Sequence, residues 1–560
     1  MLKISPQYLT LSKLLEGRLF RIPDYQRAYS WTEHQRRDLF KDILNLHAKG
    51  PDAGHFMAAV VCLRRQTLAL GTDEFHQVEV VDGQQRLTTL IILLNAVKIA
   101  LKGENKGEQK AAVELGELLV KTEGDELLLL QTNHDTSHYF SSFLREGTAG
   151  PRDKARTLAD REILAAIEEC CEFVAKWMLT GESPLSLVAL LKNRLFFLLH
   201  EIEDEKAVYT VFEVLNSRGL EVSWLDRMKS ILMGLAFELP NINNEGLISD
   251  LHKIWRDVYA TIGLRQGLST EALRFAATLC AVSAPSKPLG EKDAVEELRR
   301  SATSAKQIRK VADWIRRVTH ACNVVVANSR LNAVTRISQA RMLAVAIHLR
   351  DDIEERERDE LLAVWEKVTF RIYGMLAKDA RTKVGDYVRL AWRIINDEIP
   401  TGEIKSEISE IGRDYPIEVA IEGLKNTDCY TDWEVELRYL MFRYEEYLAK
   451  KRRPKFRNEQ WEKIWMVSPS KSIEHIWAQS KAPKNAKHRL GNLVLLPPGL
   501  NSQLQDIAPK EKIDAYRDTG LLIAQEAAGA IHDNGKKWTS KTIDARERAL
   551  LDWAKLEWAD

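Results

Sequence analysis

The sequence predicts an α+β fold in which helices predominate, with an N-terminal α/β module, a helical middle and a C-terminal ββα unit. Three observations lead to this prediction. Short apolar runs of strand length lie near both ends of the chain, residues 245–445 show helical spacing almost throughout, and the composition shifts sharply at Lys450–Arg457. Because 560 residues exceed what one hydrophobic core usually supports, we expect several domains and place them at 1–240, 241–448 and 449–560.

The N-terminal module begins with two predicted strands and a helix. Phe56–Leu63 is an apolar run of strand length, and Phe75–Val81 alternates enough to be its sheet partner. Leu87–Leu101 then has the pattern of a buried helix. Asp82 and Gly83 therefore stand at a strand-to-helix junction.

The following segments are predicted to be mainly helical. Residues 105–190 have amphipathic spacing with a break at Gly147–Pro151. Asn193–Ile202 is a further candidate strand, and Val208–Leu215 and Trp224–Phe237 have helical patterns. We therefore expect one small sheet within a chain of helices.

The bulk composition excludes few classes of function. Lys plus Arg and Asp plus Glu each total 81, so the zero net charge neither supports nor excludes a nucleic-acid partner. No run of eighteen uncharged apolar residues occurs and the N-terminus lacks the apolar core of a signal peptide, so we expect a cytoplasmic protein without a membrane span. The six cysteines form no C-x-x-C pair, and we expect buried thiols.

The most informative stretch lies near the C-terminus. Ser472–Gln479 contains an adjacent glutamate and histidine, and His488–Leu496 reads as a second strand led by a glycine. The turn Pro497–Gly499 ends this strand, and Asn501 is well placed to begin a helix. The order is therefore strand, loop, strand and helix, which is a ββα arrangement.

These residue types suit phosphodiester hydrolysis, which needs an activated water and neutralisation of charge on the leaving oxygen. A histidine such as His475 can take a proton from water near neutral pH. Mg²⁺ or Mn²⁺ prefers oxygen ligands, which Glu474 and the side chain of Asn501 supply. Adjacent residues on a strand point to opposite faces, so Glu474 and His475 both face one metal only if the backbone bends.

The pattern resembles the HNH, or His-Me finger, nuclease superfamily, in particular the branch with an E-H-I first motif and an L-G-N-L-x-L-L second motif. The resemblance implies that His475 is the general base and that Asn492 braces the loop carrying it. It also implies that Glu474 and Asn501 are the metal ligands. Ala478 stands where the family often has proline.

Two sets of residues are candidates for phosphate contact in this part of the chain. Other branches of the superfamily end the motif with a histidine that is missing here, and the helix offers Gln503, Gln505, Lys510 and Lys512 instead. The basic run 450–457, with two tryptophans after it, suits phosphate contact and equally suits a solvated linker.

A second constellation, Asp82-Gly83-Gln84-Gln85-Arg86, follows a predicted strand and opens a helix. Backbone N–H groups at a helix start attract phosphate, and glycine permits a tight turn or a close approach to a ligand. Arg86 can grip phosphate with its forked donors, and Asp82 could hold a metal or polarise water. An equally open interpretation is a capped helix start with Asp82 as the N-cap.

Two further stretches accompany this one. Phe20–Trp31 mixes aromatic side chains with arginines and a glutamine, and Val211–Leu220 is followed by Asp226 and Lys229. Together the three stretches resemble the ParB-like DGQQR family, which shows I-P-x-Y-Q-R-x-Y-x-W, D-G-Q-Q-R and F-E-x-L-N-S-R-G in this order. The match runs from about residue 10 to 235.

Taken as a whole, the chain resembles the modification-dependent (type IV) restriction endonucleases of the Gmr type, and is similar to the SspE and BrxU-like defence proteins. The resemblance implies that the N-terminal module binds and hydrolyses a nucleoside triphosphate (NTP). It also implies that this reaction regulates DNA cleavage or nicking by the C-terminal HNH domain in anti-phage defence. Expected cofactors are Mg²⁺ or Mn²⁺ and the NTP, and the expected partner is modified phage DNA.

The resemblance also assigns residues to nucleotide chemistry. They are Asp82, Gly83, Gln84, Gln85 and Arg86, with Tyr25, Gln26 and Arg27 near the same cleft and Asn216 and Arg218 as further pocket residues. No G-x-x-x-x-G-K-[ST] sequence is present, so nucleotide use follows only from the resemblance and the helix-start argument.

Two other classes of function remain open. One is an NTP-regulated nucleic-acid-binding regulator with an inactive nuclease domain, and the other is an RNA-directed toxin. The retention of Glu474, His475, Asn492 and Asn501 together favours an active nuclease. The sequence leaves open the DNA modification, the preferred nucleotide, whether hydrolysis activates or restrains cutting, nicking against double-strand cleavage, and homodimer formation.

Overall fold

The computed structural model of the chain forms two compact units. Unit 1 comprises Met1–Leu273 and Glu291–His320, and unit 2 comprises Arg274–Gly290 and Ala321–Asp560. The described residues are 6–23, 26–70, 73–101, 105–121, 127–132, 138–155, 157–204, 208, 223–239, 244–263, 265–334, 337–425, 427–431, 433–452, 469–504 and 506–559. The predicted division into three domains stays a prediction.

Unit 1 contains a six-stranded mixed sheet with the strand order β1-β8-β3-β4-β2-β7. Its strands are β1 (Gln7–Thr10), β2 (Arg18–Arg21), β3 (His55–Leu70), β4 (Asp73–Asp82), β7 (Leu130–Gln131) and β8 (Leu195–Ile202). β3 and β4 pair antiparallel, whereas β8 runs parallel to β3 and β2 runs parallel to β4. The sheet confirms the strands predicted at 56–63, 75–81 and 193–202.

Helix α3 (Gln84–Ala100) follows β4 directly and lies at the centre of the unit 1 core. Gly83 precedes it with a φ of +90°, a left-handed conformation that glycine adopts without strain. A Cβ atom at Gly83 would also lie 3.3 Å from the carbonyl oxygen of Ala59 in β3. Residues 87–97 are all buried, which confirms the predicted buried helix.

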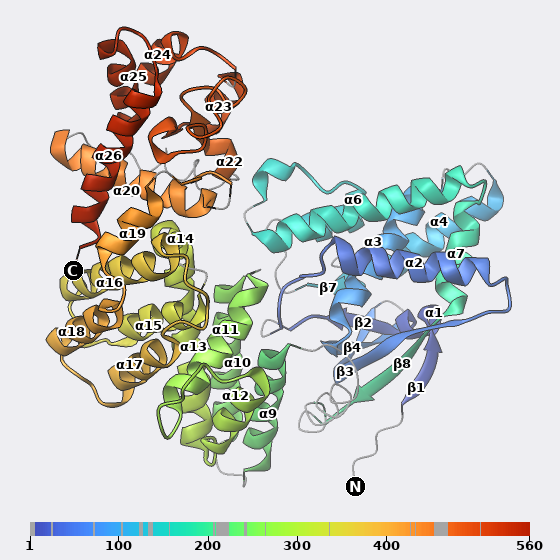
Figure 1. Ribbon diagram of the computed structural model, residues 1–560. Coiled ribbons are helices and arrows are strands. Elements are labelled where there is room, and N and C mark those ends of the chain that lie inside the picture. The colour runs from blue at the N-terminus through green and yellow to red at the C-terminus, as the bar shows by residue number, and fades with distance from the viewer. Residues whose placement is uncertain are drawn as a thin grey trace. The chain divides into compact units, whose positions relative to one another are not determined.

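Other helices cover α3. Figure 1 shows α2 (Glu33–Ala48) and α6 (Leu158–Leu179) running beside α3 above the strands. The remaining elements before residue 195 are α1 (Leu11–Leu15), α4 (Lys106–Leu119), β5 (Val120–Lys121), β6 (Leu127–Leu128), α5 (Tyr139–Glu146), η1 (Arg152–Lys154) and α7 (Pro184–Arg194). The predicted break at 147–151 is confirmed, because α5 ends at a left-handed glycine, Gly147.

Helices α9 to α13 complete unit 1, and the ends of two of them pass into unit 2. They are α9 (Trp224–Glu238), α10 (Asn244–Ile262), α11 (Gln266–Cys280), α12 (Glu291–Arg300) and α13 (Ala305–Ala327). The helix predicted at 224–237 is confirmed by α9. The helix predicted at 208–215 lies almost wholly outside the described residues.

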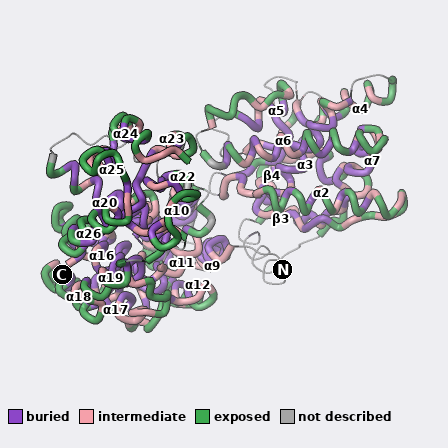
Figure 2. The backbone as a smooth tube through the Cα atoms, turned by 45° about the horizontal axis from the view of Figure 1, so that its top comes forward, coloured by how far each residue is buried: buried purple, intermediate pink, exposed green. Residues whose placement is uncertain are grey.

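Unit 2 is helical up to residue 452, as the spacing predicts. Its helices in this part are α14 (Ser329–Val334), α15 (Ser338–Leu349), α16 (Glu355–Thr369), the π-helical turn η2 (Phe370–Met375), α17 (Val384–Asn396), α18 (Thr401–Gly412), α19 (Ile417–Leu424) and α20 (Glu434–Arg452). In Figure 2 the buried stretches around α16, α19 and α20 lie inward and the exposed stretches form the rim. This pattern is that of a helical bundle with one apolar interior.

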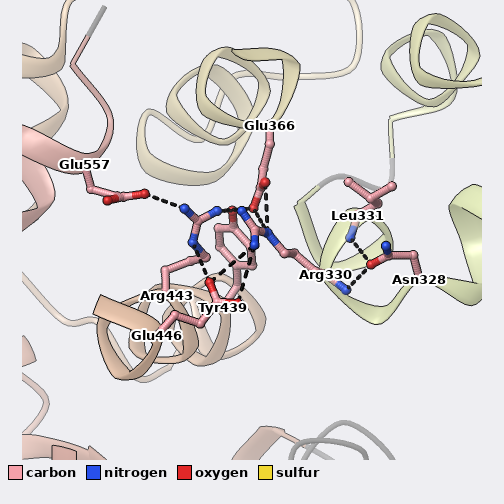
Figure 3. A network of polar contacts seen from close by, with 8 residues as sticks. All are labelled: Asn328, Arg330, Leu331, Glu366, Tyr439, Arg443, Glu446 and Glu557. Carbon is pink, nitrogen blue, oxygen red and sulfur yellow. Dashed lines mark hydrogen bonds and ion pairs between the residues drawn. The ribbon is translucent and has the colours of Figure 1, made fainter. Parts of the chain in front are cut away.

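A buried carboxylate joins three of these helices. Figure 3 shows Glu366 of α16 contacting Arg330 of α14 and both Tyr439 and Arg443 of α20. Burial alone would favour the neutral acid, but the hydrogen bond from Arg330 and the charge of Arg443 outweigh it and hold the pKa of Glu366 below its ordinary value. Arg443 also contacts Glu557 of α26, so the network reaches the C-terminal helix.

The C-terminal part of unit 2 has the predicted order of two strands and a helix. Its elements are α22 (Pro469–Ser472), β9 (Ile473–His475), η3 (Leu490–Asn492), β10 (Leu493–Leu495), α23 (Pro498–Gln503), α24 (Pro509–Asp518), α25 (Leu522–Asp533) and α26 (Ser540–Glu557). Two details differ from the prediction. Gly491 lies in a short 3₁₀ turn before the strand, and Asn501 lies inside α23 because proline already begins this helix.

Gly491 is where α26 approaches the 3₁₀ turn most closely. A Cβ atom there would overlap the backbone carbonyl oxygen of Ile543. Arg546 of α26 donates hydrogen bonds to the carbonyl oxygens of Gly491 (3.1 Å) and Leu493 (2.6 Å). The glycine is therefore required by helix packing and not only by the turn.

Two further expectations concern the whole chain. Within the part of the chain that the structure describes, every helix is too short or too polar to pass through a lipid bilayer. The expectation of buried thiols holds for Cys62, Cys170, Cys322 and Cys429 and is wrong for Cys171, which is exposed on α6.

Candidate functional site

His475 lies at the end of β9 in a cluster of polar and aromatic side chains. β9 pairs antiparallel with β10, and the side chain of His475 is buried, with 5% of the residue exposed. Its Nε2 lies 3.0 Å from Nδ1 of His488, and its Nδ1 lies 3.1 Å from the side-chain nitrogen of Gln479. The aromatic ring of Tyr430 packs edge-on against the imidazole at 4.5 Å between centroids.

The surroundings keep the His475 ring neutral. Burial is the largest cause, and electrostatic interactions with His488 and with the positive charge of Lys512 add to it, so that the pKa of His475 falls to about 3. A neutral imidazole has one nitrogen with a free electron pair, which is the form that a general base needs. The ring is therefore neutral at neutral pH, although a pKa this far below 7 also makes it a weak base.

Asn492 holds the loop that leads from His475 to the second strand. The residue is completely buried. Its side-chain oxygen accepts hydrogen bonds from the backbone N–H of Trp477 (2.9 Å) and the indole N–H of Trp538 (3.2 Å). Its side-chain nitrogen donates to the carbonyl oxygens of Trp477 (3.1 Å) and Lys487 (2.8 Å). These contacts pin the loop at both ends, which is the geometry that a bracing role requires.

Glu474 points to a different set of partners from its neighbour His475. Its carboxylate contacts the ammonium group of Lys512 on α24, and both side chains are almost fully buried. Lys512 also donates a 2.8 Å hydrogen bond to the carbonyl oxygen of His475. Burial raises the pKa of Glu474 and lowers that of Lys512, and the attraction between the two charges opposes both shifts.

The other predicted metal ligand, Asn501, lies on α23 beside β9, where its side-chain nitrogen donates a 3.0 Å hydrogen bond to the carbonyl oxygen of Ile473. A carboxylate and an amide oxygen are donors that Mg²⁺ accepts. In the structure the ammonium group of Lys512 already lies against the carboxylate of Glu474, and the amide group of Asn501 contacts the backbone of β9. Within the described ranges no group of three or more His, Cys, Asp or Glu side chains forms a ready-made metal site.

The structure therefore brings together only part of the predicted C-terminal set. His475 and Asn492 meet through the loop between the strands, since the N–H of Ile476 also donates to the carbonyl oxygen of Asn492. The side chain of Glu474 contacts Lys512, whereas the imidazole of His475 contacts His488 and Gln479, as expected for adjacent positions on a strand that face opposite sides. Lys512, one of the candidates for phosphate contact, is turned inward to Glu474 instead.

Unit 1 contains a pocket of about 460 Å³ beside the second predicted constellation. Arg27 and Arg86 line it together with Trp31, Asp226 and Tyr259. The guanidinium of Arg86 lies over the Trp31 ring at 5.5 Å, a cation–π contact. The pocket thus combines two arginines, acidic groups and an aromatic wall, and its volume suits a small organic ligand.

The acidic groups around this pocket occupy a low-dielectric environment. Burial raises the pKa of Asp82 at the end of β4, while the charges of Arg86 and Arg27 oppose the shift. Asp226 accepts hydrogen bonds from Ser223 and Tyr259. Burial also lowers the pKa of Lys229 on the same helix to about 8. Perturbed groups beside a cavity are typical of functional sites.

The glutamines of the motif face the backbone of the preceding segment. Gln84 donates to the carbonyl oxygen of Arg27 (3.2 Å), and Gln85 donates to that of Ala28 (3.1 Å) and accepts from the N–H of Ser30 (2.7 Å). Gln26 donates to a carbonyl oxygen at the end of β4 (3.0 Å). These contacts fix the segment that carries Arg27 and Trp31 against α3, so the glutamines position the pocket wall.

Some predicted residues cannot be placed. Tyr25, Asn216 and Arg218 lie outside the described residues, as do Gln505 and residues 453–468, which hold most of the basic run and both tryptophans. Of the predicted nucleotide residues, Arg27 and Arg86 line the pocket. Asp82, Gly83, Gln26, Gln84 and Gln85 are not among the residues that line it.

Several residues of the two sites were missed by the sequence analysis. At His475 they are Gln479, His488 and Tyr430. Gln479 and His488 lie in the two stretches that were recognised but were given no role. Tyr430 lies 45 positions before His475 and belongs to no motif. At the pocket, Tyr259 comes from α10, outside all three recognised stretches. Side chains supplied by distant helices leave no local pattern.

Two domain models of restriction endonucleases match the chain, one in its N-terminal part and one in its C-terminal part. Residues 11–233 match the family described as GmrSD restriction endonuclease, N-terminal domain, and residues 416–553 match GmrSD restriction endonucleases, C-terminal domain. The chain therefore carries both GmrSD domains in their order, and these support a DNA restriction endonuclease of the type IV class. No curated protein matches the chain.

Proposed function

We propose that this protein is a modification-dependent DNA endonuclease in which His475 activates the attacking water, with an NTP bound in the unit 1 pocket regulating the cut. The observation that carries the proposal is the environment of His475. A buried, neutral imidazole lies on the first strand of a ββα arrangement, inside the segment that matches a restriction endonuclease domain.

The residues in and around the hairpin have different roles in the proposed hydrolysis. His475 accepts the proton of the attacking water. Asn492 holds the loop so that the imidazole keeps its position relative to the scissile phosphate. Glu474 and Asn501 would hold a Mg²⁺ or Mn²⁺ ion, which when bound neutralises charge on the leaving oxygen. The buried ammonium of Lys512 balances the charge of Glu474.

The unit 1 pocket supplies the features that an NTP requires. Arg27 and Arg86 provide positive charge for phosphate oxygens, and Trp31 provides an aromatic surface. Asp226 lines the pocket and would carry a nucleotide-bound cation or orient water, and Asp82 would act on the pocket through its charge interactions with Arg86 and Arg27. Regulation of cutting by this pocket, in anti-phage defence, is the role that the GmrSD pairing of domains suggests.

The proposal is tested with a cleavage panel. Purified protein is incubated with unmodified, methylated, glucosylated hydroxymethylcytosine and phosphorothioate DNA, with and without NTP and with Mg²⁺, Mn²⁺ or a chelator. We expect cleavage or nicking of at least one modified DNA, dependent on the metal and changed by the NTP. His475→Ala should remove the activity while leaving the thermal unfolding profile unchanged.

A matched control keeps the test specific. His532→Ala changes an exposed histidine at the end of α25, away from the hairpin cluster, and should leave cleavage unchanged. Cleavage of RNA in place of DNA, or full cleavage by the His475→Ala variant, would refute the assignment.

A further inference from the structure

The strongest unassigned feature of the C-terminal unit is the pair of histidines at the hairpin. His488 lies in the loop before the 3₁₀ turn, and its Nδ1 is 3.0 Å from Nε2 of His475. The two imidazoles meet edge-on at 5.1 Å between centroids. On its other side, the Nδ1 of His475 is 3.1 Å from the side-chain nitrogen of Gln479. Each ring nitrogen of His475 therefore has a different partner.

These two contacts fix where the ring proton of His475 lies. An amide nitrogen such as that of Gln479 can only donate, so the Nδ1 of His475 accepts. A neutral imidazole carries its proton on the other nitrogen, so Nε2 of His475 donates to Nδ1 of His488. The nitrogen with the free electron pair is then Nδ1, and Gln479, which is an exposed residue, can give way there to water.

His488 is itself held firmly. Its ring stacks on Tyr430 with an interplanar angle of 7° and 5.3 Å between centroids. Its carbonyl oxygen accepts a 2.9 Å hydrogen bond from the N–H of Cys429. The same Tyr430 packs against His475, so one aromatic ring orients both imidazoles. Backbone and ring contacts together leave His488 little freedom to turn its Nδ1 away from His475.

We propose that His488 is the positioning residue for His475: by accepting from Nε2, it fixes the proton there and leaves Nδ1 as the basic nitrogen. The inference rests on the proposed role of His475 as general base. Without His488, the imidazole can exchange its proton between the two nitrogens or rotate, and only a fraction of molecules present the electron pair to water. The same device, a base oriented by a third group, recurs in unrelated hydrolases.

The test distinguishes two functions of His488: accepting the hydrogen bond from His475 and stacking on Tyr430. His488→Phe keeps a ring that stacks on Tyr430 but removes the acceptor, whereas His488→Asn keeps an oxygen acceptor near the Nδ1 position but removes the ring. We expect His488→Phe to lower kcat for cleavage of the active DNA by roughly 10- to 100-fold with KM unchanged. His488→Asn should keep kcat within a few-fold of the parent. A role in packing alone gives the opposite order.

The outcomes distinguish this inference from the proposed function. Absence of cleavage by the parent protein, or full cleavage by His475→Ala, contradicts the nuclease assignment itself. If the parent cleaves and His475→Ala does not, a His488→Phe variant with parental kcat overturns the positioning role. Thermal unfolding is recorded for each variant, and if His488→Phe does not fold, His488→Leu, which is smaller and also lacks the acceptor, makes the same comparison.

Discussion

Replacing Lys512 by methionine tests the buried ion pair with Glu474. The side chains of Lys512 and Glu474 are 0% and 4% exposed, so the substitution leaves a buried carboxylate without its counter-charge. It also removes the 2.8 Å hydrogen bond to the carbonyl oxygen of His475. Removing one partner of a buried pair costs roughly 3–5 kcal/mol. We therefore expect the free energy of unfolding to fall by that amount and the Tm of the transition to fall by about 6–20 °C.

Calorimetry of the parent, Lys512→Met, Glu474→Gln and the double variant measures this effect. In the double variant no charge is left unpaired, so it should be more stable than Lys512→Met alone, and the cycle gives the coupling energy directly. Lys512→Met with the parental Tm, or a double variant less stable than Lys512→Met, would refute the buried pair.

Addition of Mg²⁺ extends the same experiment to the proposed metal ligand. An ion that binds the folded state at about 100 times its Kd stabilises it by about 2.7 kcal/mol. Because the carboxylate of Glu474 lacks a counter-charge in Lys512→Met, Mg²⁺ should raise the Tm of this variant more than that of the double variant with Glu474→Gln. Equal shifts in the two variants would show that Glu474 is not a ligand.

Three further predictions use other parts of the chain. Gly491→Ala should lower stability by about 1–3 kcal/mol through overlap with α26, measured by chemical denaturation, whereas Gly499→Ala, which meets no neighbour within 4 Å, should be nearly neutral. The pKa of Lys229 in the folded protein is about 8, below its ordinary 10.5. Between about pH 8 and 10.5 Lys229 is therefore protonated in the unfolded chain and largely neutral in the folded one. The free energy of unfolding of the parent, relative to that of Lys229→Met, should rise as the pH increases over this range. A difference between the two proteins that does not change with pH would contradict this prediction. Arg86→Ala should weaken NTP binding by roughly 10- to 100-fold in titration calorimetry, with exposed Arg37→Ala as the unaffected control.

Much of the fold could be predicted from local patterns. The strands β3, β4 and β8 and the helices α3 and α9 follow apolar runs whose length and period are sufficient by themselves. The order of the strands in the sheet could not be predicted, because β2 inserts beside β4 and β8 inserts beside β3 through pairings distant in sequence. Short strands such as β9 were found only through the motif that they carry.

The sites were predictable to the extent that their residues are neighbours in sequence. Three of the four hydrogen bonds of the Asn492 side chain are with Trp477 and Lys487, which lie in the loop that the motif itself encloses, and the fourth is with Trp538. The partner of Glu474 is Lys512, on a helix 38 positions away, and no spacing in the sequence joins the two. Similarly, the side chains of Gln84 and Gln85, which were predicted to contact a nucleotide, donate hydrogen bonds to the backbone of the segment between β2 and α2, which no local spacing indicates.

Most residues of the two motifs hold the backbone in place, and fewer of them are candidates for the chemistry itself. In the second motif of the hairpin, glycine is needed for the approach of α26, and asparagine makes three hydrogen bonds with the loop and one with Trp538. In the pocket motif, Gly83 permits the turn from β4 into α3, and the glutamines fix the wall. The pKa shifts of groups such as His475 and Lys229 come mainly from burial in the folded chain. Substitutions within the backbone-holding positions should therefore reduce stability and activity together.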